Sequence, residues 1–201
     1  MKKQLFLLLV FLVPLLMAEG IMVNNSLSYN SYNADIGKMQ NRSMQIQYDP
    51  NKDYVFIAFD NYDYTTKYVY FQMESHELCL FDSVISKYKK WNLKASKESI
   101  DINKKITSLY PESVYFTYNR KLKRSANSEV ICEFITLENN KYYLKFYCDM
   151  TAQSNEYIDN TFIALLNFSQ VIALEQAIQP EQLKKYKAKA LETVKIESEF
   201  E

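Results

Sequence analysis

Glycine is nearly absent from this chain of 201 residues, which contains only Gly20 and Gly37. Phosphate-binding loops and the nucleophile turn of α/β-hydrolases need glycines at fixed spacing, because the backbone there adopts conformations that other residues disfavour. The sequence therefore excludes Walker A, GxGxxG and GxSxG motifs. Turns must instead use asparagine and aspartate, which tolerate a left-handed backbone better than other residues.

The N-terminus carries two lysines followed by an apolar run. Lys2 and Lys3 precede a nearly unbroken apolar segment over 5–17, which ends at Ala18 and the acidic Glu19. This order is typical of a secretory signal peptide. We therefore expect cleavage after Ala18 and a secreted or periplasmic protein, including one associated with the cell envelope. The alternative is a retained membrane anchor, although the apolar run is shorter than the ~20 residues of a spanning helix.

Charge is balanced, with 24 basic and 24 acidic residues. Without residues 1–18 the chain keeps 22 basic and 24 acidic residues, a formal charge of −2. Nucleic acids and anionic membranes attract strongly basic surfaces, so we expect neither as a partner. No segment after residue 18 is apolar enough to predict a membrane span.

Hydrophobic patterning predicts a single α+β domain over 43–196, between a flexible Asn/Ser-rich leader (19–42) and an acidic tail (197–201). Strands are expected over 43–48, 54–60, 66–73, 100–106, 113–118, 129–137 and 141–148. Helices are expected over 75–96, 157–178 and 180–196, and a basic loop over 119–127. This order, βββαββββαα, favours an antiparallel sheet of about 6–7 strands with two or three helices on one face.

The three cysteines, Cys79, Cys132 and Cys148, show no metal-ligand spacing, and we expect no metal or other cofactor. Cys132 and Cys148 lie on strands that predict a hairpin. If paired residue numbers sum to 280, the two thiols oppose each other within reach of a disulfide; if they sum to 279, the thiols point to opposite faces. Apolar matching favours the first register and turn chemistry the second. Cys79 is expected to be a buried free thiol.

Residue patterns that suggest catalysis or metal binding are weak. His76 and Cys79 lie three residues apart on a predicted helix, where packing explains them better than a nucleophile pair does. Residues 49–53 match the opening of a calcium loop, but Tyr54 stands where that loop requires glycine. We therefore assign no catalytic residue and no metal ligand.

Tyrosines in several predicted strands fall opposite the more apolar residues. If helices cover the apolar face, the other face presents aromatic rings with hydroxyl tips, which suit contact with a protein or a sugar. Ordinary cross-strand packing on a solvated face is the alternative. The candidate binding residues are Tyr68, Tyr70, Tyr115, Tyr143 and Tyr147.

The layout resembles that of small exported bacterial proteins of unknown function. The resemblance rests on the signal peptide, the strand meander, the amphipathic helix, and the segment Tyr142-Tyr143-Leu144-Lys145-Phe146 followed by Ile158-Asp159-Asn160. It implies no activity. We therefore hypothesise a non-enzymatic binding protein for an unknown protein or carbohydrate. The alternative is a secreted hydrolase whose acid and base carboxylates are brought together by the fold, from among Asp60, Asp63 and Glu74.

Overall fold

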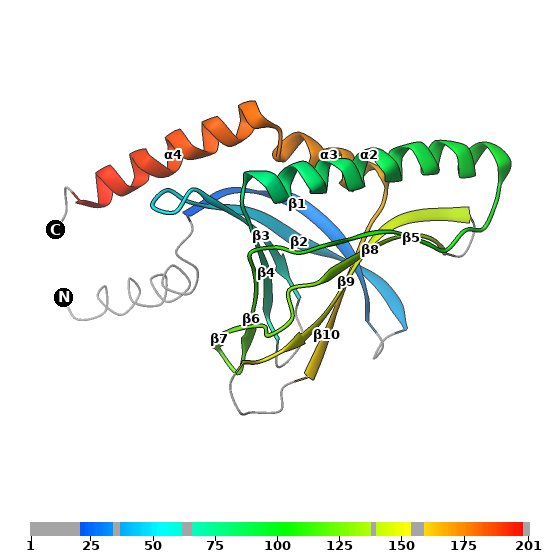
Figure 1. The fold of residues 1–201 in the computed structure, drawn as a ribbon, viewed down its shortest axis with the longest axis horizontal. Helices are drawn as coiled ribbons and strands as arrows, with labels where there is room; N and C mark the ends of the chain where they lie inside the picture. The colour runs from blue at the N-terminus through cyan, green and yellow to red at the C-terminus, as the bar shows by residue number, and fades with distance from the viewer. Residues whose placement is uncertain (1–20, 34–36, 62–65, 138–139, 154–158, 199–201) are drawn as a thin grey trace.

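The structure is a computed structural model that describes residues 21–33, 37–61, 66–137, 140–153 and 159–198. Within these ranges the chain forms one antiparallel sheet of ten strands with three helices, which confirms the predicted α+β class (Figure 1). The strands are β1 (Ile21–Asn33), β2 (Lys38–Asp49), β3 (Tyr54–Asp60), β4 (Tyr68–Met73), β5 (Lys104–Leu109), β6 (Ser113–Tyr118), β7 (Lys121–Arg124), β8 (Val130–Leu137), β9 (Lys141–Thr151) and β10 (Asp159–Leu166). The helices are α2 (Ser75–Glu98), α3 (Phe168–Ala177) and α4 (Pro180–Ser198). Across the sheet the strand order is β5-β8-β9-β10-β1-β2-β3-β4-β6-β7.

The sheet curls until strands far apart in its order touch through their inner faces. Phe162 of β10 packs against Phe59 of β3 and Phe71 of β4, with ring centroids 5.0 and 5.9 Å apart. In a flat sheet β10 and β3, three strand spacings apart, would be separated by about 14 Å. Asn160 Nδ2 also donates to Thr66 Oγ1 at 2.8 Å, linking β10 to the start of β4. The curl encloses the main core on one face of the sheet.

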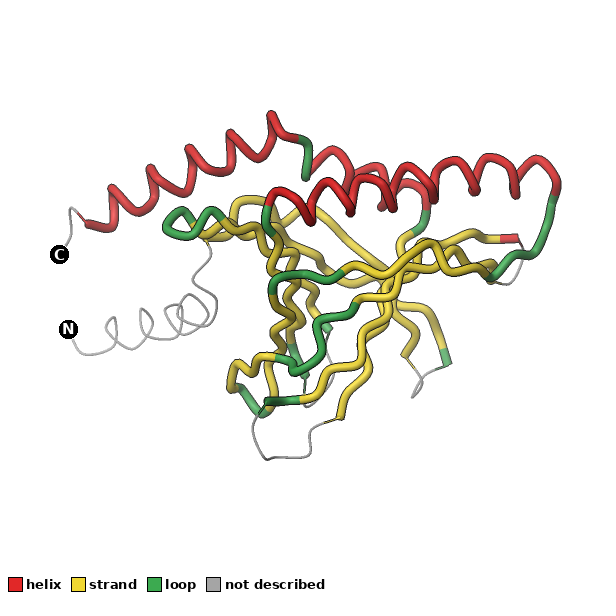
Figure 2. Tube along the Cα trace, viewed as in Figure 1, coloured by secondary structure: helices red, strands yellow, loops and turns green. Residues whose placement is uncertain are grey.

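Helix α2 packs on this inner face, and all three helices lie along one side of the molecule (Figure 2). Phe81 stacks on Phe146 of β9, with ring centroids 5.3 Å apart. The Tyr88 hydroxyl donates to the carbonyl of Tyr142 at 3.1 Å, and the Tyr142 hydroxyl donates to the carbonyl of Ala95 at 3.0 Å. These reciprocal hydrogen bonds fix the helix along β9. Four residues at helical spacing, Leu78, Phe81, Ile85 and Tyr88, are buried as predicted, and Val84 is buried beside them.

The predicted flexible leader over 19–42 is wrong for the residues that the structure describes. Strand β1 and the start of β2 occupy this segment, and β1 lies between β10 and β2 inside the sheet. Its inner face buries Val23, Leu27 and Tyr29. The pairing of β1 with β2 shifts register between residues 22 and 27. Val23, Leu27 and Tyr29 alternate with a period of two, but Asn25, at the position between Val23 and Leu27, is polar and exposed where the register shifts, so the sequence pattern is interrupted there.

The helix predicted over 157–178 is wrong in its first half. Residues 159–166 form strand β10, and helix α3 begins only at Phe168. Asn167 caps the helix: its side chain accepts from the Gln170 backbone N–H at 3.0 Å, and Gln170 Oε1 accepts from the Asn167 N–H at 3.0 Å. A short run of apolar residues has no clear periodicity, so it is compatible with a buried strand and with a buried helix.

The basic segment over 119–127, expected as a loop, contains strand β7. Asn119 and Arg120 take left-handed backbone angles, φ 49° and 65°, in a two-residue hairpin turn between β6 and β7. With β1, β7 and β10 added, the sheet has ten strands within the described residues instead of about 6–7. The observed order is ββββαββββββαα, which differs from the predicted βββαββββαα.

The β8–β9 hairpin adopts neither register considered from the sequence. Cys132 lies opposite Phe146 and Ile131 opposite Tyr147, so paired numbers sum to 278. Cys148 is on the same buried face as Cys132 but two residues out of direct opposition. Both are free thiols, so the disulfide considered for the even-sum register is not formed. Burial raises the pKa of both thiols, that of Cys148 to about 12. Cys79, expected to be buried, is exposed on α2.

The thiols should differ sharply in reactivity. We expect one rapid equivalent of a thiol reagent such as 5,5′-dithiobis(2-nitrobenzoate) on the native protein, from Cys79, because the thiolate is the reactive species and the other two thiols are buried. Cys79→Ala should remove this rapid phase, and unfolding should expose the remaining two thiols. Only one titratable thiol after unfolding would instead indicate a Cys132–Cys148 disulfide.

Phe162→Ala should lower the free energy of unfolding more than the same change at the next residue of the strand. The Phe162 ring is fully buried against the rings of Phe59 and Phe71, whereas Ile163 is 40% exposed. We expect a loss of about 3–5 kcal/mol in the free energy of unfolding for Phe162→Ala. The control, Ile163→Ala, should lose about 0.5 kcal/mol or less. Denaturant titration measures both, and equal losses would contradict the inner contact between β10 and β3.

Candidate functional site

The outer face of β3, β4, β6 and β7 carries a second, smaller apolar cluster. We call it the outer aromatic patch and define it as Tyr54, Phe56, Ala58, Tyr68, Tyr70, Tyr115 and Leu122. Its residues alternate along β3 and β4 with those of the main core, so they point away from the helices. The sequence hides half of this alternation, because β3 is apolar on both faces.

Strand register explains why the patch is continuous. Ala58 pairs with Tyr70, Tyr70 with Tyr115, and Tyr115 with Arg124, which makes one row across four strands. Ala58 is the only small side chain in this row, and the Tyr68 and Tyr70 rings lie 6.1 Å apart beside it. The row thus ends in the exposed Arg124, whose guanidinium donates to the Glu112 carbonyl at 3.3 Å.

The tyrosines of the patch differ in burial. Tyr70 is only 6% exposed, and desolvation raises the pKa of its hydroxyl far above the ordinary value. Tyr54, Tyr68 and Tyr115 are half-buried around it. Lys67 Nζ lies 5.0 Å from the centroid of the Tyr68 ring, a cation–π contact. Tyr70 therefore anchors the patch, and the half-buried rings are the ones that a partner can reach.

The structure brings together three of the five predicted tyrosines. Tyr68, Tyr70 and Tyr115 share the outer aromatic patch, whereas Tyr143 and Tyr147 lie on β9, which four strands separate from β4. Tyr147 donates to Asp149 Oδ1 at 2.7 Å, and Lys145 Nζ lies 5.3 Å from its ring centroid. All five tyrosines therefore lie on the face opposite the main core, but they form two separate groups instead of one surface.

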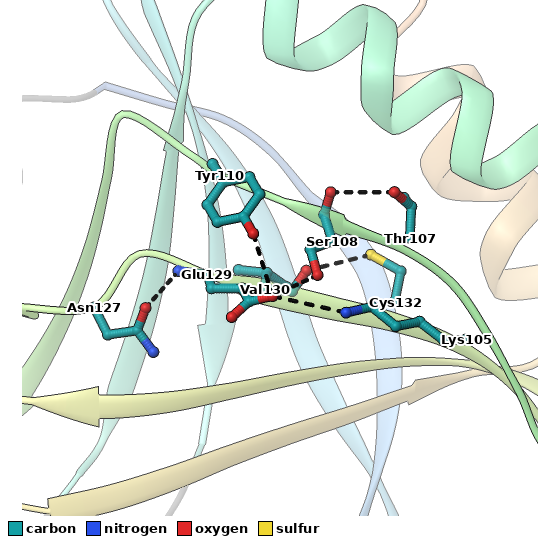
Figure 3. Close-up of polar contacts among 8 residues, drawn as sticks. All are labelled: Lys105, Thr107, Ser108, Tyr110, Asn127, Glu129, Val130 and Cys132. Atoms are coloured by element: carbon teal, nitrogen blue, oxygen red, sulfur yellow. Dashed lines mark hydrogen bonds and ion pairs between the residues drawn. The ribbon is translucent and has the colours of Figure 1, made fainter.

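A polar cluster surrounds Glu129 at the edge formed by β5 and β8 (Figure 3). Its Oε1 accepts from Ser108 Oγ at 2.5 Å and lies 3.4 Å from the Tyr110 hydroxyl and 3.7 Å from Lys105 Nζ. The hydrogen bond from Ser108 is the main cause that lowers the pKa of the Glu129 carboxyl. A single ionised carboxylate surrounded by donors fastens the edge strand β5 to β8, but it supplies no acid and base pair.

A cavity of about 250 Å³ opens between the β2–β3 turn and the first turns of α2 and α4. It is lined by Tyr48, Asp53, Val55, Ser75, Leu78, Pro180, Leu183, Lys184 and Lys187. Asp53 is the one carboxylate among these lining residues. The hydrolase hypothesis requires two carboxylates in one concave site. Asp60 and Glu74 do not line the cavity, and Asp63 lies outside the described residues.

The remaining candidates for catalysis and metal binding have local structural roles. Asp49 Oδ1 accepts from the backbone N–H groups of Asn51 and Lys52 at 2.9 and 3.3 Å, as in a tight turn. No group of three potential metal ligands occurs among the described residues. The ring of His76, 70% exposed, lies 3.6–3.7 Å from the carboxylates of Glu74 and Glu77.

Among the helices that the structure describes, none combines the length and the apolar character needed to cross a membrane.

Comparisons of the chain with protein-family models, with curated proteins and with solved structures find no match. Its fold and the geometry of its surfaces therefore carry the functional argument.

The ionic contacts of Asp53 predict a pH dependence of stability. Hydrogen bonds from Tyr48 and Lys187 lower the pKa of Asp53 below its ordinary 3.8. A carboxyl whose pKa is lower in the folded than in the unfolded state stabilises the protein fully when the pH is above the unfolded-state pKa. This stabilisation is lost as the pH falls through the folded-state pKa. We expect the Tm advantage of the wild type over Asp53→Asn to shrink below about pH 4.

Thermal unfolding across a pH series measures this difference. Glu181→Gln is the matched control, because the Glu181 carboxylate is 81% exposed and pairs with Lys184 on the same helix. Its effect on Tm should be small at every pH. A wild-type advantage over Asp53→Asn that stays constant down to strongly acidic pH would contradict the lowered pKa of Asp53.

Proposed function

We propose that this protein is an exported, non-enzymatic binding protein whose outer aromatic patch contacts a partner protein. The observation that carries the proposal is an apolar cluster, with three half-buried tyrosines, on the sheet face opposite the helices. A solvated sheet face ordinarily presents polar side chains. Export is inferred from the signal-peptide pattern of residues 1–18, which lie outside the described residues.

The composition of the patch favours a protein over a carbohydrate. Protein interfaces are enriched in tyrosine, phenylalanine and arginine, and Tyr115 and Arg124 are direct neighbours here. A sugar site needs polar groups that are available to its hydroxyls. Two polar neighbours of the patch are unavailable to a sugar: Gln72 is 6% exposed, and Thr117 Oγ1 accepts from the N–H groups of Lys67 and Tyr68.

The double variant Tyr68→Ala/Tyr115→Ala tests this proposal, because both side chains are half-buried and Tyr70 can stay in place as the anchor. Tyr143→Ala/Tyr147→Ala is the matched control on the other half of the sheet, with two half-buried tyrosines on one strand. Thermal unfolding first establishes that both double variants fold. A photo-crosslinking amino acid placed at position 68 or at position 143 captures the partner protein, which is then identified and purified.

We expect a discrete protein adduct from position 68 and none from position 143. The purified partner should bind Tyr68→Ala/Tyr115→Ala at least about tenfold more weakly than the wild type, because a few aromatic residues dominate such interfaces. Binding to the control variant should be unchanged. Equal losses for both variants, or saturable binding of glycans with no protein adduct at position 68, would overturn the assignment.

A further inference from the structure

The cavity beside the β2–β3 turn is separate from the outer aromatic patch. Val55 lines it on the inner face of β3, whereas the neighbouring Tyr54 and Phe56 belong to the patch on the outer face. Its apolar wall consists of Val55, Leu78, Pro180 and Leu183. Its volume of about 250 Å³ holds several waters at about 30 Å³ each. It is smaller than the ~300–1,000 Å³ of sites for drug-sized ligands. A fitting ligand is therefore small.

Both signs of charge lie beside this apolar wall. Asp53 Oδ1 accepts from the buried Tyr48 hydroxyl and from Lys187 Nζ, the latter at 3.1 Å. The left-handed backbone at Asp53, φ 59°, places the carboxylate in this position. These contacts hold Asp53 as an anion whose second oxygen is available to a ligand cation.

Lys184 supplies a cation next to the same wall. It lies one helical turn before Lys187 on α4, so the two ammonium groups share one helix face. Its ion pair with Glu181, at 2.9 Å, is between side chains that are 73% and 81% exposed. Such exposed pairs are weak, so Lys184 can exchange this partner for a ligand carboxylate.

We infer that this cavity binds a small zwitterion with an apolar side chain, such as a free aliphatic or aromatic amino acid. The ligand ammonium lies against Asp53, its carboxylate against Lys184 and Lys187, and its side chain against Leu78 and Leu183. A ligand with one charge gains contact with either Asp53 or the two lysines but not with both, so it binds more weakly than a zwitterion. A ligand without a side chain leaves the apolar wall hydrated.

Calorimetric titration with L-leucine and L-phenylalanine tests this inference on the purified protein. The comparison ligands are 4-methylpentanoate, which is leucine without the ammonium, isoamylamine, which is leucine without the carboxylate, and glycine, which lacks the side chain. We expect saturable binding of leucine or phenylalanine with a matching rise in Tm. Each comparison ligand should bind at least about tenfold more weakly, because it lacks one of the three contacts that leucine makes.

Variants of the lining residues locate the ligand. Asp53→Asn and Lys184→Gln should each weaken leucine binding at least about tenfold, and Leu183→Trp should abolish it by filling the cavity. Lys185→Gln is the matched control, since Lys185 is exposed on the same helix and does not line the cavity. Circular dichroism establishes that each variant folds.

Two results would overturn the inference. Binding of 4-methylpentanoate as tightly as leucine would make the cavity a site for apolar anions. No saturable binding of leucine or phenylalanine at millimolar concentration would remove the amino-acid assignment. Neither result bears on the partner of the outer aromatic patch, whose test uses different variants.

Discussion

The contact of Phe162 with Phe59 and Phe71 joins strands that a flat sheet would hold about 14 Å apart. A wide sheet with helices along only one side must bury its inner face in some further way, since exposed apolar surface is costly. Here the sheet covers part of that face itself by curling, and α2 covers another part through Phe81 and Tyr88. The core, the position of the helices and the walls of the cavity all depend on this curl.

The curl also makes the two faces of the sheet unequal. Among the described residues, the inner face is a continuous core, whereas the outer face holds one isolated apolar cluster built around Tyr70. Tyr70 is as buried as many core residues, although none of the helices that the structure describes packs on its side of the sheet. Neighbouring rings and Ala58 provide that burial through direct pairing across strands. A surface of this kind is preorganised for contact, because its central side chain is already immobile.

Local patterns in the sequence predicted the elements whose periodicity is regular. The stripe of α2 and the start of α4 at Pro180 follow from helical spacing and from proline chemistry. Strand β1 was missed because its pairing is irregular, and β10 because its apolar run suits a helix equally well. The alternation of Tyr68 and Tyr70 indicated their shared face, but only the strand order shows that Tyr143 lies elsewhere. The cavity was not predictable, since the β2–β3 turn, α2 and α4 meet only in the folded chain.

The central place of β1 has a consequence for the order in which the chain can fold. β1 pairs with β2 early, but its other neighbour, β10, begins only at residue 159, and Asn30 meets Leu165 across 135 residues. Contacts of such sequence separation slow folding, because a long loop must close before they form. A chain made from its N-terminus therefore exposes the free edge of β1 until nearly all of it has been synthesised. The sheet is completed from its middle, by the last strand to emerge.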